Sequence, residues 1–271
     1  MSDEGIFAAY LARWGLVPDG APIITPYSSL LPVRHGDVPA MLKVAREAEE
    51  RAGARLMAWW DGDGAARVLA HEGDALLLER APGGGSLVRM ARTGRDDEAS
   101  RILCAAAARL HAPRDRPPPE LVPLEHWFRA LAPAAARYGG ILARAGAAAR
   151  ELLAAPRDVV VLHGDLHHGN VLDFGARGWL AIDPKGLVGE RGFDFANLFC
   201  NPDLETATAP GRLARQVEVV AEAAGLERTR LLKWVLAYAG LSAAWTLEEG
   251  DDRPEIAFAV AELAAAELAR A

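Results

Sequence analysis

The chain has 271 residues, of which 51% are hydrophobic, and a formal net charge of −7 from 30 basic and 37 acidic side chains. This length supports the core of one large domain or two small ones. The acidic balance lacks the positive surface that binding to nucleic acid requires, so we expect no nucleic-acid partner.

Cysteine usage and hydropathy narrow the class of protein further. The two cysteines, Cys104 and Cys200, stand apart in apolar segments, which disfavours both a disulfide framework and a thiolate metal site. The chain shows neither a signal-peptide pattern nor an apolar run of membrane-spanning length. We therefore expect a cytoplasmic protein without a membrane partner; the composition carries no information on oligomeric state.

The first eighty residues predict a small sheet crossed by one main helix. Residues 6–16 have the apolar spacing of a short helix. The runs "SSLLPVR" and "VPAMLKVA" predict a hairpin around "HGD", and residues 45–60 are rich in helix formers up to the turn signal "DGDG". Residues 66–81 then predict two strands joined by "HEGD".

After the interruption "PGGGS" at residues 82–86, the composition changes to alanine-rich helix. Helical patterns cover residues 98–112 and about 125–155, and "VVVLHGD" predicts a strand. The segments "NVLDF" and "GWLAID" predict a hairpin, and helices follow from about residue 193. The expected class is α+β: an N-terminal lobe over residues 1–81, and a larger, mostly helical C-terminal lobe over residues 82–271 with a short β-insert.

The stretch "VLHGDLHHGNVLDFGARGWLAIDPKG" contains the residues that indicate chemistry. His163, Asp165 and Asn170 fit the pattern H-x-D-x-x-x-x-N, and Asp183 follows at the end of a strand. This is the catalytic-loop spacing of the protein-kinase template, in which one Asp orients the acceptor hydroxyl while an Asn and a second Asp hold Mg²⁺. Magnesium requires such hard oxygen ligands, and the attacking hydroxyl requires a carboxylate without metal.

A zinc site built on histidines is the alternative for the same stretch. His163 and His167 are four residues apart, but Gly164 and Gly169 disfavour the helix that would place them on one face. No cysteine lies nearby. The simpler hypothesis is that His163 orders the loop, while His167 and His168 are either polar loop residues or line the site.

A phosphotransferase also needs a strand lysine for the nucleotide phosphates and a helical glutamate to hold it. Lys43 is the only lysine in the first 150 residues of a chain that otherwise uses arginine. Its partner is Glu47, Glu49 or Glu50, of which we favour Glu50.

Two further segments of the first lobe are candidates for nucleotide contact. Ser28 and Ser29 lie where a phosphate-covering loop is expected. Glu79 to Ala81 would offer backbone groups to the adenine edge, and the glycines after them would act as a hinge between the lobes. A phosphate-binding glycine loop is disfavoured there because the GxxxxGK[ST] pattern is absent.

With these residues in place, the sequence resembles the aminoglycoside phosphotransferase family, in its streptomycin 6-kinase and hydroxyurea-kinase branch. The resemblance covers nearly the whole chain and is carried by "LHGDLHHGNVL", "GWLAIDPKGLVGE", "GFDFANLF" and "AYAGLSAAW". It implies a kinase-like bilobal fold that uses ATP and Mg²⁺. It also implies Asp165 as catalytic base, Asn170 and Asp183 as metal ligands and Lys43 on the α- and β-phosphates. Asp194 would hydrogen-bond the catalytic loop.

The acceptor is less well defined by the sequence. Lys185 and Glu190 follow the metal-binding Asp and could contact phosphate or acceptor, or form a solvated pair. Glu248, Glu249 and Asp251 could face the guanidinium groups of a streptomycin-like substrate, or belong to a solvated acidic loop. Hydroxyurea, a sugar or an amino-alcohol metabolite, and a silent kinase-like binding module stay open as alternatives, as does GTP in place of ATP.

Overall fold

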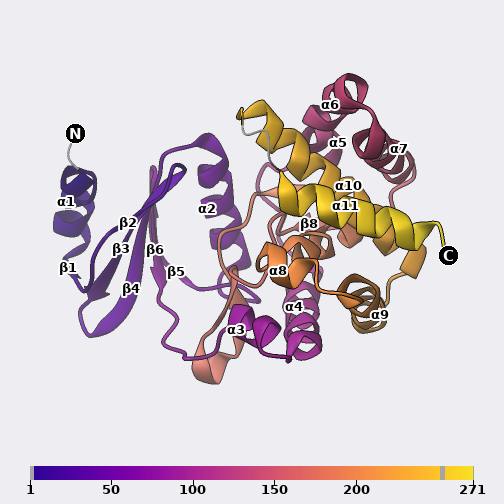
Figure 1. Cartoon of the computed structure of the whole chain (residues 1–271). Coiled ribbons are helices and arrows are strands. Elements are labelled where there is room, and N and C mark those ends of the chain that lie inside the picture. Colours follow the sequence, from indigo (N-terminus) through magenta and orange to yellow (C-terminus); the bar gives the residue numbers. More distant parts are fainter. Residues whose placement is uncertain (1–2, 251–253, 271) are drawn as a thin grey trace.

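The protein is described by a computed structural model that covers residues 3–250 and 254–270. Two lobes lie side by side, with the N-terminal sheet at one end and the helical part at the other (Figure 1). The elements of the N-terminal lobe are α1 (Asp3–Trp14), β1 (Leu16–Pro18), β2 (Ile23–Ile24), β3 (Ser28–His35), β4 (Val38–Ala45), α2 (Ala48–Trp60), β5 (Val68–Glu72) and β6 (Ala75–Glu79). All of the strand pairs in this lobe are antiparallel, in the order β1-β3-β4-β6-β5, with β2 against β3.

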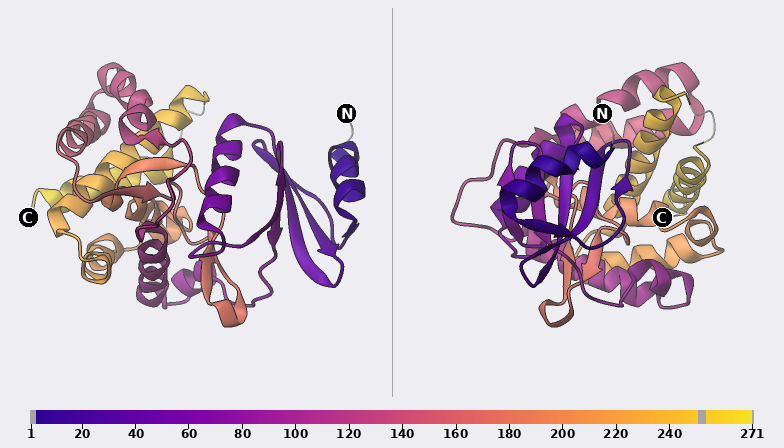
Figure 2. Two further views of the ribbon diagram at one scale, coloured as in Figure 1. Left: turned by 180° about the vertical axis from the view of Figure 1, so that it is seen from behind. Right: turned by 90° about the vertical axis from the view of Figure 1, so that its left-hand side faces the viewer.

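The sheet is covered on both faces because its central strands are apolar on both faces. In β6, Leu77 belongs to the core under α1, whereas Leu76 and Leu78 belong to the core that includes α2. Successive strand residues point to opposite faces, so the run "ALLLE" supplies both layers. Figure 2 shows α1 on the outer face of the sheet and α2 on the inner face, next to the C-terminal lobe. Helix α2 therefore lies between the sheet and the C-terminal lobe.

The lobes are joined by close backbone contacts at α2. A Cβ atom on Gly53 would overlap the carbonyl oxygen of Pro184, so glycine permits this approach. Beyond the helix, the Ala66 amide donates to the Ala181 carbonyl at 2.9 Å, and the Trp60 ring stacks on His163 with centroids 6.2 Å apart. A single hydrophobic core thus continues from α2 into the C-terminal lobe. The division after Ala81 falls between β6 and α3, and stays a prediction.

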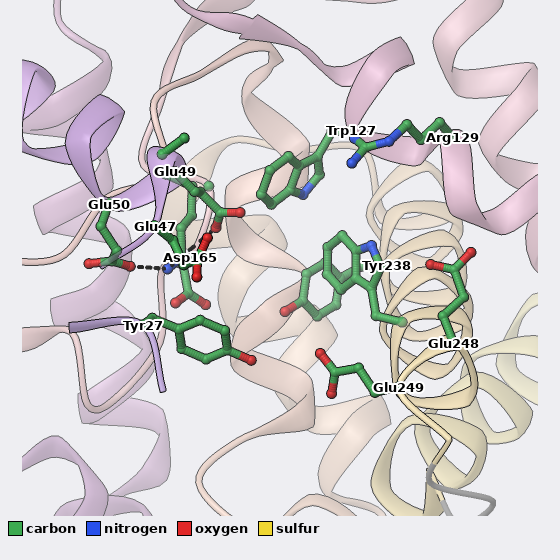
Figure 3. A pocket seen from close by; sticks show the side chains of 14 residues that line it. Tyr27, Glu47, Glu49, Glu50, Trp127, Arg129, Asp165, Tyr238, Glu248 and Glu249 are labelled. Atoms are coloured by element: carbon green, nitrogen blue, oxygen red, sulfur yellow. Dashed lines mark hydrogen bonds and ion pairs between the residues drawn. The ribbon is translucent and has the colours of Figure 1, made fainter. Parts of the chain in front are cut away.

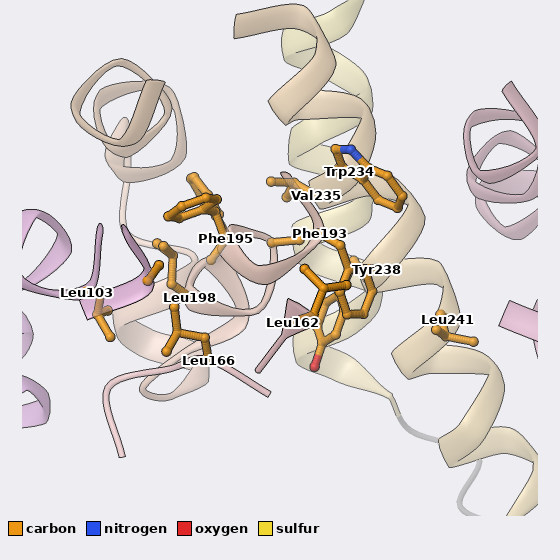
Figure 4. Close-up of a cluster of buried hydrophobic side chains, with 14 of the residues drawn as sticks. Leu103, Leu162, Leu166, Phe193, Phe195, Leu198, Trp234, Val235, Tyr238 and Leu241 are labelled. Carbon is orange, nitrogen blue, oxygen red and sulfur yellow. The ribbon is translucent and has the colours of Figure 1, made fainter. Parts of the chain in front are cut away.

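The C-terminal lobe is mostly helical, as predicted. Its helix α10 is apolar on nearly every side and packs against α7, α9 and α11 and against the 3₁₀ segment 191–195. Figure 4 shows the aromatic cluster at this contact, where Phe193 meets Trp234 and Tyr238 edge to face. The longer helices are α3 (Leu87–Arg92), α4 (Asp96–His111), α6 (Leu131–Tyr138), α7 (Gly140–Ala154), α9 (Arg212–Ala224), α10 (Arg228–Glu248) and α11 (Glu255–Leu268), and the short ones α5 (Leu124–Trp127) and α8 (Leu204–Ala207).

Short strands in this lobe flank the segments that carry Asp165 and Asp183. β8 (Val159–Leu162) pairs with β11 (Leu187–Glu190), which also pairs with β7 (Val122–Pro123). β9 (Val171–Asp173) and β10 (Trp179–Ala181) form the predicted hairpin. The loop between β8 and β9 and the loop between β10 and β11 therefore begin and end on ordered strands.

The glycines at residues 83–85, which the sequence predicts to be a hinge between the lobes, lie against β9. The Gly83 amide donates to the Asp173 carbonyl at 3.2 Å, and the Gly85 amide donates to its carboxylate at 3.2 Å. A Cβ on Gly85 would lie 2.7 Å from that carboxylate and 2.9 Å from the Trp179 ring. Here glycine permits the close approach of two backbones, and the segment is fastened to β9.

Across residues 3–250 and 254–270, none of the helices combines the length and apolar character needed to cross a membrane.

Candidate active site

The catalytic loop, residues 163–170, is held by a buried carboxylate. Asp194 accepts hydrogen bonds from the amides of His163 at 2.8 Å and Gly164 at 2.7 Å, and its Oδ2 lies 2.7 Å from His111 Nε2. Burial would raise the pKa of Asp194, but the hydrogen bond and charge of His111 outweigh it, so the pKa is lowered. Gly164 has φ +84°, which suits glycine, and a Cβ there would crowd Leu187.

His163 supports the loop from inside the protein. Its Nε2 lies 2.8 Å from the Ile182 carbonyl, and its Nδ1 accepts from the Asp165 amide at 3.2 Å. These partners define a neutral ring with the proton on Nε2, and burial lowers the pKa of His163 accordingly. The ring therefore links the loop that carries Asp165 to the strand that leads to Asp183.

Asp165 is placed by two amide side chains. Asn197 Nδ2 donates to Oδ1 at 2.7 Å, and Asn170 Nδ2 donates to the backbone carbonyl at 2.9 Å and to Oδ2 at 3.2 Å. Burial raises the pKa of Asp165 to about 7, against the opposing charge of Lys185. A carboxylate with a pKa near neutrality is suited to receive a proton from a hydroxyl.

Asn170 and Asp183 lie on adjoining segments, because the Ile182 amide donates to the Asn170 carbonyl at 2.9 Å. Asp183 has φ +64°, an unfavourable backbone conformation for a residue other than glycine. Burial would raise the pKa of Asp183, but Lys43 and Lys185 lower it, so this carboxylate is ionised at neutral pH. Since Asn170 Nδ2 is committed to Asp165, its Oδ1 is the atom left for a cation. A carboxylate and an amide oxygen fit Mg²⁺ in their chemistry.

A network of two lysines and three carboxylates lies beside these residues. Lys43 Nζ forms ion pairs with Glu50 Oε2 and with Asp183, so Glu50, and neither Glu47 nor Glu49, is its helical partner. Lys185 Nζ lies 3.2 Å from Glu50 Oε1 and 3.5 Å from Glu49. Glu50 thus holds one ammonium group on each of its oxygens. Burial would lower the pKa of Lys185, but the surrounding carboxylates raise it.

A cavity of about 620 Å³ opens between the sheet and the β9–β10 hairpin. Lys43 and Asp183 lie on its wall, and the apolar part of the wall includes Leu76, Leu78 and Phe174. The predicted nucleotide contacts Ser28, Glu79 and Ala81 also line it. The cavity combines an apolar wall with charged groups that include Lys43 and Asp183, as a nucleotide requires.

Ser29 does not line this cavity, contrary to the prediction. It is fully buried, and its hydroxyl accepts from Arg46 Nε at 3.0 Å. The reason is strand alternation: Ser28 and Ser29 are consecutive in β3 and point to opposite faces. The Glu79 side chain is also engaged, with Arg177 and with the Arg67 amide.

A second cavity, of about 670 Å³, lies on the other side of Asp165. Figure 3 shows Glu248, the last residue of α10, and Glu249 directly after it facing this cavity opposite Asp165 and the start of α2, with the rings of Trp127 and Tyr238 between them. The predicted substrate residues Glu248 and Glu249 thus lie at this cavity, while Asp251 lies outside the described residues. The carboxylates that line the second cavity are Glu47, Glu49, Glu50, Asp165, Glu248 and Glu249, and its cations are Arg129 and Lys185.

Glu190 does not face either of these cavities, so its prediction as a substrate contact was wrong. Its carboxylate accepts from Arg230 Nε at 2.6 Å, from Trp234 Nε1 at 2.8 Å and from the Arg157 amide at 2.9 Å. Burial would raise the pKa of Glu190, but these donors lower it. Antiparallel pairing of β11 with β8 carries Glu190 to the far end of the sheet from Asp165, opposite Val159.

The histidine alternative has no structural support. His167 Nδ1 accepts from the Gly169 amide at 3.0 Å, and His168 is buried away from both cavities. Over residues 3–250 and 254–270, the structure contains no group of three or more His, Cys, Asp or Glu side chains arranged to hold a metal ion.

Several cavity residues were missed by the sequence analysis. Trp127 and Trp245 stack edge to face with centroids 5.4 Å apart and line the second cavity, although Trp245 has the sequence context of a core residue. Tyr27 lines both cavities, and Asn197 contacts Asp165. The position of Asn197 three residues after Asp194, in "GFDFANLF", was the one available signal.

Comparison with known proteins agrees with this geometry. A family model described as aminoglycoside/hydroxyurea antibiotic resistance kinase matches residues 13–250. The chain belongs to this kinase family. The kinase is an ATP-dependent phosphotransferase that acts on hydroxyl groups, which confirms the resemblance and the enzyme class inferred from the sequence.

Two relatives of the kinase show the range of the family. A streptomycin 3''-kinase of Klebsiella pneumoniae is 58% identical over 245 residues, covering 89% of this chain and 92% of the relative. A hydroxyurea phosphotransferase of Kitasatospora aureofaciens is 34% identical and covers 96% of this chain and 78% of the relative.

Solved structures establish the fold of the kinase. A choline/ethanolamine kinase family protein from Mesorhizobium loti superposes with a TM-score of 0.68 at 20% identity, covering 99% of this chain and 96% of that one. The aminoglycoside phosphotransferase APH(3'')-Id from Streptomyces rimosus, in complex with ADP and streptomycin, superposes with a TM-score of 0.60 at 19% identity, covering 89% and 98%. The predicted kinase-like bilobal fold is confirmed.

Proposed function

We propose that the kinase transfers the γ-phosphoryl group of ATP to a hydroxyl of streptomycin. The observation that carries this proposal is the acidic cavity beside Asp165, where carboxylates from α2 and from the end of α10 face one another across aromatic rings. Streptomycin carries guanidinium groups, and carboxylates recognise guanidinium through charge-assisted hydrogen bonds. The name of the 58%-identical relative agrees with this acceptor.

The size and charge of the cavity favour streptomycin over hydroxyurea. A volume of about 670 Å³ lies within the ordinary range of sites for drug-sized ligands, whereas hydroxyurea is neutral and has only a few atoms. The rings of Trp127 and Trp245 add flat surfaces for a guanidinium group.

The nucleotide is assigned to the cavity that contains Lys43. The adenine would lie along the apolar wall near Leu78 and Ala81, and the phosphates would reach Lys43. Asn170 and Asp183 would hold the Mg²⁺ that accompanies ATP, and the bound ion would neutralise charge on the β- and γ-phosphates. Because ATP is a cytoplasmic metabolite, we place the reaction in the cytoplasm.

Asp165 would act on the acceptor hydroxyl from the boundary of the two cavities. It lines both of them, so it can orient a hydroxyl from the acceptor side towards the terminal phosphate on the donor side. Phosphoryl transfer has a loose transition state and depends mainly on positioning and charge neutralisation, so the protein supplies little covalent chemistry.

The test is the release of ADP by the purified kinase with Mg-ATP and streptomycin, followed by a coupled assay. Hygromycin B and hydroxyurea serve as comparison acceptors, and the phosphorylated position is read from NMR spectra of the product. We expect stimulation by streptomycin that falls by about 10²- to 10⁴-fold in Asp165→Ala. Stimulation by hydroxyurea in place of streptomycin, or undiminished activity in Asp165→Ala, would refute the proposal.

A further inference from the structure

The two cavities meet at a small set of side chains. The residues that line both cavities are Tyr27, Glu50, Asp165 and Lys185. A phosphoryl group that passes from a nucleotide in one cavity to an acceptor in the other must pass among them. Lys185 is the one cation in this set, and its Nζ lies 3.2 Å from Glu50 and 3.5 Å from Glu49.

The rarity of lysine in this chain also draws attention to Lys185. Three of the 30 basic residues are lysines, namely Lys43, Lys185 and Lys233. Two of these three reach opposite oxygens of one carboxylate, that of Glu50, although they lie 142 positions apart in the chain. An ammonium group is a compact point charge, whereas guanidinium is planar and larger. The site therefore contains two small cations held by one buried glutamate.

The two lysines differ in the cavities that they reach. Of the two cavities, Lys43 lines the nucleotide cavity alone, whereas Lys185 lines both the nucleotide cavity and the acceptor cavity. The side chain of Lys185 is 16% exposed, and the adjoining Gly186 lies close to α2, where an added Cβ would be 3.2 Å from the Cβ of Ala52. Its ammonium is thus fixed at the boundary and still open to both ligands.

We propose that Lys185 is a catalytic residue that contacts the transferring phosphoryl group, while Lys43 contacts the phosphates that stay with ADP. This inference rests on the proposed function for the position of the acceptor. In the step, the bond from the γ-phosphorus to the β,γ-bridging oxygen breaks, and this oxygen leaves as part of ADP with the electron pair of the bond. The acceptor oxygen bonds to the γ-phosphorus and its proton passes to Asp165. Lys185 keeps its proton and offsets the negative charge of the phosphoryl oxygens.

The experiment compares Lys185→Gln with Lys233→Gln, a matched change at a partly exposed lysine of α10 that pairs with Glu151 and lines neither cavity. We expect Lys185→Gln to lower kcat by about 10²- to 10³-fold, the usual loss for one preorganised donor to a developing charge, while Lys233→Gln keeps wild-type activity. ADP should bind Lys185→Gln as it binds the wild type. Aluminium fluoride mimics the planar phosphoryl group and should increase the affinity of the wild type for Mg-ADP. This increase should be lost in Lys185→Gln.

The pH profile separates this role from an indirect one. If Lys185 only tuned Asp165, activity of Lys185→Gln would recover at high pH, and that recovery would overturn the proposal, as would an unchanged kcat or lost ADP binding. Should Lys185→Gln fail to fold, the double variant Lys185→Gln/Glu49→Gln removes one charge of each sign and takes its place. ATP hydrolysis without acceptor and fluoride-dependent ADP binding need no streptomycin. If streptomycin does not stimulate the wild-type enzyme, the proposed function is refuted, but these two assays still test the role of Lys185.

Discussion

Substitution of Asp194 by asparagine should destabilise the kinase strongly, although Asp194 touches neither cavity. Its carboxylate accepts from the amides of His163 and Gly164 and pairs with His111, all between 2.7 and 2.8 Å. Asparagine retains one acceptor oxygen but turns an NH₂ group towards a donor. Breaking a buried pair of this kind costs about 3–5 kcal/mol. For a protein of this size, that loss corresponds to a decrease in Tm of about 6–20 °C.

Thermal unfolding followed by circular dichroism measures this decrease, with Asp203→Asn as the control. Asp203 caps the N-terminus of α8, where asparagine caps equally well, and its only loss is a partly exposed ion pair with Arg92 worth at most about 1 kcal/mol, so the Tm should change little. The kcat of Asp194→Asn should fall as well, because the carboxylate fixes the loop that carries Asp165. Equal Tm values for the two variants would refute the assignment of Asp194 as the support of the catalytic loop.

The same carboxylate predicts a dependence of stability on pH. The pKa of Asp194 is lowered in the folded protein, so the carboxylate contributes stability that is present above the unfolded-state value of about 3.9. That contribution is lost as the pH falls through the folded-state value. Asp194→Asn has no such group to titrate, and its free energy of unfolding should therefore fall less than that of the wild type between neutral and strongly acidic pH. Parallel curves for the two proteins would contradict this expectation.

Three further predictions follow from the site and from the contact between the lobes. The kcat/KM for the acceptor should decrease below a pH of about 7, because burial raises the pKa of Asp165 to about 7 and its charged form is needed; a flat profile down to pH 5 would argue against Asp165 as base. Gly53→Ala should lower the free energy of unfolding by about 1–3 kcal/mol, since its Cβ would overlap a backbone carbonyl, whereas Gly84→Ala, which meets open space, should be neutral in urea unfolding. Glu248→Gln and Glu249→Gln should each raise the KM for streptomycin by about 2- to 5-fold, as expected for exposed ion pairs; a change in the KM for ATP instead would show that these residues do not serve the acceptor cavity.

Local chemistry explains the parts of the fold that were predicted correctly. The hairpin of β3 and β4, the helix α2 and the hairpin of β9 and β10 each follow from periodicity and turn residues within a short window of sequence. Gly83 and Gly85 show a constraint that such reasoning does not reach. A Cβ at either position would collide with Asp173, about ninety positions away in the chain.

The sequence by itself determined the chemistry of this protein: the spacing of His163, Asp165, Asn170 and Asp183, together with a rare lysine, indicated a kinase site. Only the tertiary structure decided which neighbouring side chains join it. The structure selects Glu50 on α2, separates Ser28 from Ser29 and turns Glu190 away from the site towards Arg230. The physical reason is that motif spacing is fixed along the backbone. The direction of a side chain depends instead on packing between segments that lie far apart in the chain.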